Sequence, residues 1–402
     1  MVTCKIGDEN LKILLVNSVC GIGSTGKICV DLYRGLTNLG HECCIAYGRG
    51  NKVDDIQTYK IGNNLNTLLH VVENRFFDNH GFASRKTTRD FVEFIEEYRP
   101  DIIHLHNIHG YYINTEILFE YLKSKSIPVI WTFHDAWPFS GHAAYIDYVG
   151  DKQLPQRNMH FSERFSYPKL FRDNSAANWK KKKKIFSDLK NCTIVTPSDW
   201  LKKMTEDSFF SECDIITINN GIDLSKYEKE SENKRVNEPA KKNILAVANI
   251  WEKRKGLEDV IYFNNQLSDD YKFTIVGKVS KRLPSGITHI SRTDSFDVLL
   301  DLYREADVFI NPTYRDNFPT TNIESLAAGT PIITYDTGGS REAINDNVGF
   351  VVKQGSKKEF IEKIIEVKKN KYVRDSCKLQ ALKYDKANMI KAYIELYEKS
   401  LE

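Results

Sequence analysis

Short apolar runs with the character of buried strands alternate along the chain with segments whose apolar residues recur at helical spacing. In the first half, the pattern predicts a strand, a glycine-rich loop, a helix and a second strand in succession, which is a βαβ opening. Two later runs follow Pro100 and Pro128, at the position where a strand tolerates proline. The predicted strands cover residues 12–17, 42–47, 102–105, 129–133 and 193–196, and the helix covers residues 28–39.

A second α/β series follows a polar stretch over residues 225–242 that is typical of a linker. Its predicted strands cover residues 244–248, 273–276, 308–310 and 331–335, and its helices cover residues 256–266, 296–306 and 322–328. Such alternation predicts parallel doubly wound sheets, and 402 residues exceed what one hydrophobic core usually serves. We therefore expect an α/β protein with domains at residues 1–218 and 219–384. Residues 142–169 show no clear period and are expected to form a long loop near the site.

The composition excludes several classes of protein. The apolar fraction of 41% is ordinary for a soluble protein, and no apolar stretch approaches the roughly 18 to 20 residues that span a bilayer. The chain starts without a signal-peptide pattern, which predicts a cytoplasmic protein. Its eight cysteines include no Cys-x-x-Cys pair, so reduced and mostly buried thiols are expected. A net charge of +3 is too small to indicate nucleic-acid binding.

One dense basic run stands out against this modest charge. It lies beside Trp179 and consists of Lys180, Lys181, Lys182, Lys183 and Lys184. Two interpretations are open. The lysines either form the solvated face of a helix, or contact anionic lipid headgroups or a lipid-pyrophosphate acceptor, for which clustered lysines beside an aromatic residue are suited. The second interpretation implies peripheral contact with the inner face of a membrane.

The most informative segment is NPTYRDNFPTTNIE, at residues 311–324. Asp316 and Glu324 lie on either side of a turn between a predicted strand and a predicted helix. Carboxylates accept charge-assisted hydrogen bonds from sugar and ribose hydroxyls, and each such bond contributes roughly 1.5 to 3 kcal/mol. Free backbone N–H groups of Thr320, Thr321 and Asn322 would point out of the helix start, where an anionic phosphate is favoured. The segment suits a sugar-nucleotide site, although a helix cap beside a surface acid has the same pattern.

This segment resembles the carboxylate-x7-carboxylate motif of retaining glycosyltransferases of the GT4 type, which have the GT-B architecture. Other strings agree with that family in order: TFHD at residues 132–135, VTPS at 195–198, NNGID at 219–223, KG at 255–256, FTIVG at 273–277, and AGTPII at 328–333 followed by GG at 338–339. The resemblance covers nearly the whole chain. It implies two Rossmann-like domains that face each other across an active-site cleft, and a C-terminal helix at residues 385–402 that packs back on the first domain.

The resemblance also implies a nucleoside-diphosphate sugar as donor, carried by UDP or GDP, with no metal or other cofactor. Glu324 would hold the ribose, Asp316 the sugar hydroxyls and Lys255 the pyrophosphate. Relatives usually carry an arginine shortly before that lysine, whereas this chain has Asn249, so Arg254 is the candidate for a second cation. The other residues expected to contact the donor are Gly23, Gly277, Phe318, Pro319, Thr320 and Thr321.

The first domain offers a histidine after a predicted strand. His134 precedes Asp135, whose carboxylate could orient the imidazole through a hydrogen bond. The resemblance places His134 beside the donor sugar, and the alternative is a histidine that merely caps the next segment. His104 and His106 lie on one face of a strand with His109 nearby, but no carboxylate or cysteine accompanies them at ligand spacing. We therefore expect no metal, and we expect His109 at the acceptor.

The loop GIGSTGK at residues 21–27 contains most of a phosphate-binding P-loop, and this makes an NTPase the sharpest rival. The next residue is Ile28, however, where a P-loop needs Ser or Thr to hold Mg²⁺. Glycines also let backbone N–H groups approach a sugar or phosphate closely. We accordingly expect Gly21 and Ser24 at the acceptor and Gly23 at the donor.

These expectations describe a retaining transferase that moves a hexose-type sugar to a hydroxyl of a saccharide or lipid-linked acceptor, in polysaccharide or other surface-glycan synthesis. Two alternatives share the architecture: a sugar-nucleotide epimerase or hydrolase, and a non-catalytic nucleotide-sugar binding subunit. One departure from similar sequences concerns the acceptor. Gly141 and His142 are followed by two alanines instead of a cysteine-rich cluster.

Overall fold

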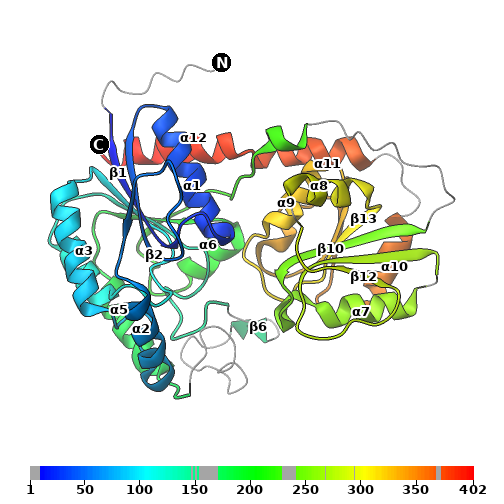
Figure 1. Cartoon of the computed structure of the whole chain (residues 1–402), viewed down its shortest axis with the longest axis horizontal. Coiled ribbons are helices and arrows are strands. Elements are labelled where there is room, and N and C mark those ends of the chain that lie inside the picture. The colour runs from blue at the N-terminus through cyan, green and yellow to red at the C-terminus, as the bar shows by residue number, and fades with distance from the viewer. Residues whose placement is uncertain are drawn as a thin grey trace. The chain divides into compact units, whose positions relative to one another are not determined.

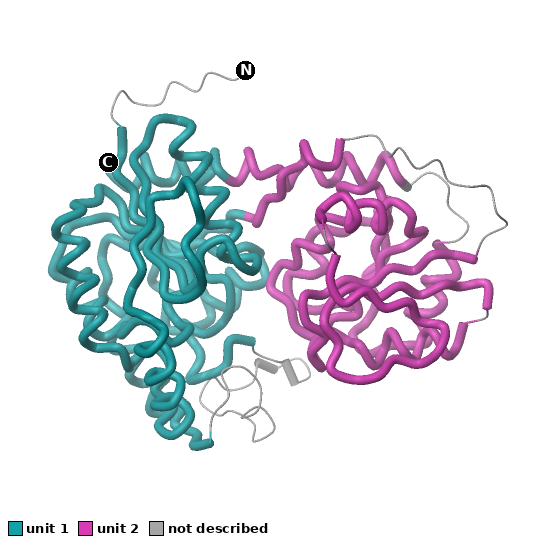
Figure 2. The backbone as a smooth tube through the Cα atoms, viewed as in Figure 1, with its two compact units in different colours: residues 1–218, 390–402 teal, residues 219–389 magenta. Residues whose placement is uncertain are grey.

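The computed structural model describes residues 10–145, 171–228, 241–267, 269–293, 295–367 and 373–402, together with two short strands, β6 (Tyr148–Val149) and β7 (Lys152–Gln153). Most of the loop expected over residues 142–169 lies outside these residues. The chain divides into two compact units (Figure 2): Met1–Ile218 with Ile390–Glu402, and Asn219–Met389. Each unit has its own sheet and its own buried core.

The first unit contains a seven-stranded sheet in the order β3-β2-β1-β4-β5-β8-β9 (Figure 1). Its strands are β1 (Lys12–Val19), β2 (Glu42–Arg49), β3 (Thr58–Lys60), β4 (Ile102–Leu105), β5 (Val129–Thr132), β8 (Cys192–Thr196) and β9 (Asp214–Thr217). All pairs are parallel, and β1 lies between β2 and β4. The apolar runs are buried on both faces, as parallel strands require, and the predicted doubly wound sheet is confirmed.

Helices connect these strands. They are α1 (Gly23–Asn38), α2 (Asn64–Phe77), α3 (Arg85–Tyr98), α4 (Thr115–Lys123), α5 (Ser175–Phe186) and α6 (Asp199–Glu206). Helix α1 begins at Gly23 and not at residue 28, because its first turn is polar and carries no apolar repeat. This earlier start places Gly23 and Ser24 inside the helix.

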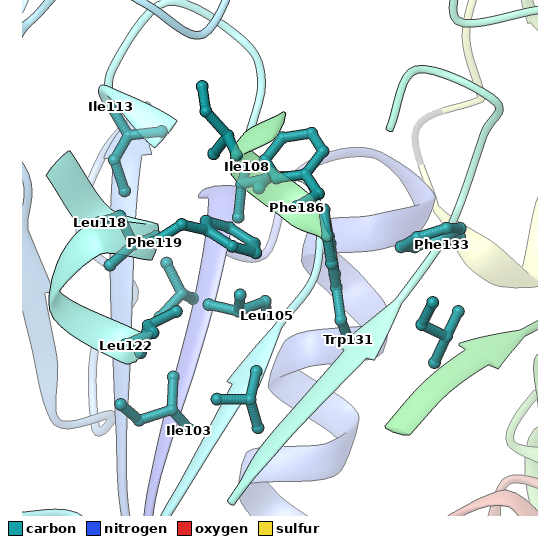
Figure 3. Packing of buried hydrophobic residues seen from close by; sticks show 14 of the residues in the cluster. Ile103, Leu105, Ile108, Ile113, Leu118, Phe119, Leu122, Trp131, Phe133 and Phe186 are labelled. Carbon is teal, nitrogen blue, oxygen red and sulfur yellow. The ribbon is translucent and has the colours of Figure 1, made fainter. Parts of the chain in front are cut away.

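An aromatic cluster packs α4 and α5 against β5 (Figure 3). The Trp131 ring on β5 lies 5.1 Å from the ring of Phe119 and 5.0 Å from that of Phe186, measured between centroids. Leu105 on β4 belongs to the same cluster. Burying an aromatic side chain of this size stabilises the fold by roughly 1.5 to 3 kcal/mol. The cluster therefore fixes the ends of β4 and β5, from which the histidine-bearing loops emerge.

The second unit contains a six-stranded parallel sheet in the order β12-β11-β10-β13-β14-β15. Its strands are β10 (Lys242–Ile250), β11 (Tyr271–Lys278), β12 (Ile287–Ile290), β13 (Val308–Asn311), β14 (Ile332–Tyr335) and β15 (Gly349–Val352). Its helices are α7 (Leu257–Gln266), α8 (Phe296–Glu305), α9 (Thr320–Ala327), α10 (Lys357–Val367) and α11 (Val373–Ala381). In both sheets the strand order reverses beside the first strand, which creates the switch point where ligands of open α/β sheets bind.

The last helix, α12 (Lys386–Lys399), has its C-terminal part in the first unit. There Ile390 lies against Gly35 of α1, where a Cβ would come within 2.5 Å of the isoleucine side chain. Tyr393 and Tyr397 reach the sheet through hydrogen bonds to Thr132 and His104. Tyr393 and Tyr397 of α12 are thus part of the core of the first unit.

Two expectations about chain class can be compared with the described residues. Within them, no helix combines the length and the apolar character needed to cross a bilayer. The cysteines among them are free thiols: Cys20, Cys29, Cys43, Cys44, Cys192, Cys213 and Cys377.

Candidate functional site

The loops that follow β10 and β13 lie side by side at the switch point of the second unit. The carbonyl of Arg254 accepts hydrogen bonds from the backbone N–H of Tyr314, at 2.7 Å, and from the hydroxyl of Thr313, at 3.1 Å. Gly256 makes this approach possible, because its φ is +75° and a Cβ there would lie 2.0 Å from the carbonyl oxygen of Pro312. Two loops that are about 60 residues apart in sequence therefore form one surface.

Lys255 and Asp316 form an ion pair on this surface, between the lysine Nζ and the carboxylate Oδ2. Their side chains are only 20% and 14% exposed, so the pair is largely shielded from water. Arg254 is held nearby by Glu252, at 3.1 Å, and by the carbonyl of Arg315, at 3.2 Å. The structure thus brings together three of the charged residues expected at the donor.

Helix α9 begins next to this pair, with Pro319 as its N-cap. The helix starts at Thr320, two positions earlier than the predicted residue 322, so Thr320 and Thr321 form its first turn. The expectation that Asn322 offers a free N–H is wrong, since this group donates to the carbonyl of Pro319 at 3.1 Å. An N–H in the first turn that finds a partner this close is not available to an anion.

Glu324 lies one turn further along α9, and its Oε2 accepts a hydrogen bond from the Tyr303 hydroxyl at 3.1 Å. Burial, followed by the charge of Glu324, raises the pKa of Tyr303 well above its ordinary value, so the tyrosine stays a neutral donor. Phe318 is buried, with its ring 5.6 Å from that of Tyr384. Glu324 is therefore held in place by a side chain of α8, and Phe318 anchors the loop.

Gly277 and Asn249 lie where β10 and β11 lose regular register, between Val247 and Ile250. Gly277 has a φ of +120°, and a Cβ at this position would lie 1.6 Å from the carbonyl oxygen of Ala248. The glycine is thus required by the close approach of two strands, whatever its role toward a ligand. Asn249 is exposed on the irregular strand end.

In the first unit, the loop after β1 is closed by its own backbone. The N–H of Gly21 donates to the carbonyl of Gly26 at 3.1 Å, so the expected approach of that N–H to a ligand is wrong. Gly23 has a φ of +66°, a Cβ there would meet nothing within 4 Å, and Ser24 is exposed. Asn17 ties this loop to the one after β4, because its Oδ1 accepts from the N–H of residue 107 at 3.2 Å.

The histidines after β4 and β5 pair differently from the expectation. The predicted orientation of His134 by Asp135 is wrong as to its hydrogen bond, because Asp135 Oδ2 accepts from His109 Nε2 at 2.9 Å and Oδ1 accepts from the N–H of Trp137 at 2.9 Å. His134 is instead hydrogen-bonded through Nε2 to Nδ1 of His106, at 2.9 Å. His109 is buried and serves Asp135, so it belongs to the scaffold of this loop.

Burial determines the protonation of this cluster. Burial lowers the pKa of His134 to about 4, although the charge of Asp135 acts in the opposite direction. Burial also raises the pKa of Asp135, but the charge and hydrogen bond of His109 bring it below its ordinary value. His134 is therefore a neutral imidazole near pH 7, able to share a hydrogen bond with an uncharged hydroxyl.

His104 does not offer a metal ligand. Its Nδ1 is bonded to the Tyr397 hydroxyl at 2.6 Å and its Nε2 to the Thr132 hydroxyl at 2.8 Å, so both ring nitrogens are used. Among the residues that the structure describes, no group of three or more His, Cys, Asp or Glu side chains has the arrangement of a metal site.

The lysine run on α5 is divided between surface and core. Lys182 is 1% exposed, and its Nζ donates to the carbonyls of Trp137, at 2.7 Å, and Ser140, at 3.1 Å. The same nitrogen lies 3.6 Å from the centroid of the Trp137 ring. The expectation that the whole run contacts a membrane is therefore wrong for Lys182, which instead clamps the loop that carries Asp135. A lysine run contains no signal that would single out its buried member.

Comparisons with known proteins agree over most of the chain. A family model described as Glycosyltransferase Family 4 matches residues 25–226, and one described as Glycosyl transferases group 1 matches residues 228–384. The chain is 22% identical over 371 residues to a putative colanic acid biosynthesis glycosyl transferase, WcaC, of Escherichia coli, covering 86% of this chain and 88% of that protein.

Two further proteins are similar. One is an N,N'-diacetylbacillosaminyl-diphospho-undecaprenol alpha-1,3-N-acetylgalactosaminyltransferase of Campylobacter jejuni, 27% identical over 206 residues, covering 45% of this chain and 53% of that protein. The other is the crystal structure of a glycosyltransferase from Rickettsia africae, which matches with a TM-score of 0.70 at 17% identity and covers 98% of this chain and 99% of that one.

Proposed function

Because the chain belongs to glycosyltransferase family 4 and has the GT-B fold, we propose that it transfers a hexose-type sugar from a UDP- or GDP-sugar to a hydroxyl of an acceptor. Transfer proceeds with retention at the anomeric carbon, and it requires no cofactor. The acceptor is a saccharide or a lipid-linked saccharide, and the product enters a surface polysaccharide. The names of the Escherichia coli and Campylobacter jejuni relatives support this choice of pathway and acceptor.

The observation that carries the proposal is the arrangement around the ion pair of Lys255 and Asp316. A cation, a carboxylate and the start of α9 occur together at the switch point of a doubly wound sheet. The Lys255 ammonium and the N–H groups of Thr320 and Thr321 suit a diphosphate. Asp316 suits sugar hydroxyls, and Glu324 suits the vicinal hydroxyls of ribose.

The chemistry follows from these charges. As the bond between the anomeric carbon and the phosphate breaks, negative charge develops on the leaving diphosphate, where Lys255 and the α9 dipole stabilise it. The acceptor hydroxyl attacks from the same face, and its proton passes to the departing phosphate oxygen. Asp316 holds the sugar while its ring takes up positive charge. In the first unit, the neutral imidazole of His134 is suited to a hydrogen bond with an uncharged hydroxyl.

Two alternatives are separated from this proposal by product analysis. An epimerase or hydrolase would convert the donor or release free sugar without an acceptor, and a binding subunit would show affinity without turnover. The P-loop rival is disfavoured by position, since Lys27 is already in the second turn of α1 and Ile28 follows it.

The first experiment is calorimetry of the purified protein with UDP, GDP and ATP, with and without Mg²⁺, alongside Glu324→Ala. Tight metal-independent binding of UDP or GDP that is lost in the variant supports the donor site. Tyr303→Phe is the matched control, because it removes the partner of Glu324 but leaves the carboxylate in place. Binding of ATP only in the presence of Mg²⁺ would overturn the proposal.

A further inference from the structure

Helix α2 has the opposite orientation from an ordinary surface helix. Its buried positions include the polar residues His70 and Asn74, whereas its large apolar side chains face outward. The outward side chains are 46–61% exposed and lie on successive turns: Leu65, Leu68, Leu69, Val72, Phe76 and Phe77. A contiguous apolar surface of this kind marks an interaction site more often than chance exposure of single side chains.

The inward face of α2 is satisfied by specific polar contacts, which hold the helix in this orientation. His70 Nδ1 is bonded to the Ser84 hydroxyl at 2.8 Å, and its Nε2 lies 3.3 Å from the carbonyl of Asn79. A reciprocal capping box between Asn63 and Asn66 fixes the first turn. Rotation of α2 to bury its leucines would break these bonds, so the outward apolar face is the stable arrangement.

The apolar surface continues onto the segment before α5. The Phe171 ring is 64% exposed and lies 5.7 Å from that of Phe76, and the Phe171 N–H donates to the carbonyl of Arg75 at 2.8 Å. Figure 1 shows α5 beside α2, and the side-chain amide of Asn178 joins the two through a 2.7 Å bond to the carbonyl of Asp78.

Exposed cations accompany this apolar surface. Arg75 is adjacent in the chain to Phe76 and Arg172 to Phe171, and α5 carries the exposed side chains of Lys180, Lys183 and Lys184. The three lysines share one face of α5, since they are spaced at positions i, i+3 and i+4. A leucine and phenylalanine face accompanied by arginine and lysine is the composition of helices that lie in the headgroup region of anionic membranes.

We propose that the outward face of α2 and Phe171 form a membrane-docking surface that inserts into an anionic lipid bilayer. The purpose of this docking rests on the proposed function, because it would bring the enzyme to a lipid-linked acceptor. Docking itself is a property of the surface and does not require transfer. The exposed cations select a lipid surface over a second copy of the chain, whose identical cations would face these.

The test is sedimentation with vesicles of phosphatidylcholine, with and without phosphatidylglycerol, in the absence of donor and acceptor. Leu68→Gln/Leu69→Gln should weaken binding to the anionic vesicles at least tenfold. The matched control is Leu379→Gln/Leu382→Gln, which changes two leucines of the second unit that are 69% and 56% exposed and should bind like the unaltered protein.

Equal vesicle binding by both double variants, or no binding of the unaltered protein, would overturn the membrane-docking surface. Light scattering of the unaltered protein that shows a dimer lost in Leu68→Gln/Leu69→Gln, without vesicle binding, would assign the surface to a second copy and would also overturn it. Because no sugar nucleotide is present, neither result bears on the proposed transferase activity.

A separate observation concerns the ring of His106. Its Nδ1 lies 2.9 Å from Nε2 of His134, and its Nε2 is buried with no hydrogen-bond partner in the described part of the chain. Only one of the two bonded nitrogens carries the hydrogen. If His134 donated it, His106 would hold its own hydrogen on Nε2, as a buried N–H without an acceptor. Such orphaned donors are rarer in proteins than orphaned acceptors.

We infer that His106 is a positioning residue: its Nδ1–H donates to His134 and holds that imidazole in the tautomer with hydrogen on Nδ1. Burial keeps both rings neutral, which the argument requires. The ring of His104, tilted by 31° and 4.0 Å away between centroids, limits rotation of His106. His134 then presents a hydrogen-bond donor at Nδ1 and an occupied acceptor at Nε2.

Two substitutions separate this role from simple packing. His106→Asn retains an N–H donor close to the position of Nδ1, whereas His106→Leu fills the space without a donor. Long-range proton–nitrogen NMR spectra of histidine-labelled protein, with His134 assigned by its own substitution, should show the Nδ1–H tautomer in the unaltered protein and in His106→Asn, and a mixture in His106→Leu. The kcat should fall about tenfold in His106→Leu only, with KM little changed.

An Nε2–H tautomer of His134 in the unaltered protein would refute the inference, as would identical spectra for the asparagine and leucine variants. The NMR readout requires no turnover, so its failure is distinguishable from a failure of the proposed function.

Discussion

On the proposal that Lys255 binds the diphosphate of the donor, Asp316 competes for the same ammonium, so Asp316→Asn should tighten the binding of a nucleoside diphosphate. In the structure the Lys255 ammonium is paired with the Asp316 carboxylate in a largely shielded position. A diphosphate has to take over that ammonium or share it. Asparagine keeps the shape of the side chain and removes the competing negative charge.

The size of the effect follows from the burial of the pair. A charge-assisted hydrogen bond contributes roughly 1.5 to 3 kcal/mol, and hydration of the separated groups compensates for part of this free energy when the bond breaks. About 1.4 kcal/mol, close to the lower value of this range, corresponds to a tenfold change in Kd. We expect Asp316→Asn to lower the Kd for UDP or GDP about tenfold and Lys255→Met to raise it by a similar factor. Transfer should fall in both variants, because Asp316 is proposed to hold the sugar.

The assay is calorimetry with the nucleoside diphosphate alone, so that lost sugar contacts do not enter. Glu366→Gln is the matched control, since it removes the same charge from an exposed pair with Lys363 on α10 of the same unit. An unchanged or higher Kd in Asp316→Asn would refute the competition. Equal tightening in Glu366→Gln would show that net charge is responsible.

Three other perturbations test the scaffold around the site. Gly277→Ala should destabilise the protein by more than about 3 kcal/mol in urea unfolding, since a Cβ would overlap the carbonyl of Ala248; a stable variant would contradict the strand geometry. Lys182→Met removes the short hydrogen bonds of the ammonium to the buried carbonyls of Trp137 and Ser140, at a cost of about 1 to 3 kcal/mol, so thermal unfolding should occur at a clearly lower temperature than in the exposed control Lys180→Met; equal temperatures would argue against this role of Lys182. Burial lowers the pKa of His70 to about 4, so between pH 4 and 6.5 the unfolded chain binds more protons than the folded one, and the free energy of unfolding decreases as the pH is lowered. His70→Gln should reduce the difference in the free energy of unfolding between pH 7 and pH 5 by about 2 kcal/mol. An unchanged difference would refute the lowered pKa of His70.

Much of the fold could be predicted from the sequence, because its signals are local. The strand at residues 102–105 has its predicted bounds, since a proline and a short apolar run mark both ends. The start of α1 was predicted five residues late, because a first turn of glycine, serine and threonine has no apolar period. Helix α2 was not predicted, although its apolar residues recur at helical spacing, and the structure places these residues on the exposed face.

The residues of the candidate site also include some that a local sequence pattern predicts and some that it does not. A carboxylate motif between a strand and a helix is a local pattern, and it located Asp316 and Glu324 at a sheet edge. Their partners are not local. Lys255 pairs across 61 residues, and His104 reaches Tyr397 across 293 residues. Periodicity has no information about contacts of this kind.

The sequence alone therefore determined the class of fold, the order of its elements and the position of the carboxylate motif, because each depends on spacing over a few residues. Only the tertiary structure decided which charges neutralise one another. It paired Asp135 with His109 instead of His134, buried Lys182 among four exposed or half-buried neighbours, and turned the leucines of α2 outward. The physical reason is that burial and hydrogen-bond partners are set by which elements meet in space, and the same side chain can be a surface charge or a core clamp depending on the strand or helix that covers it.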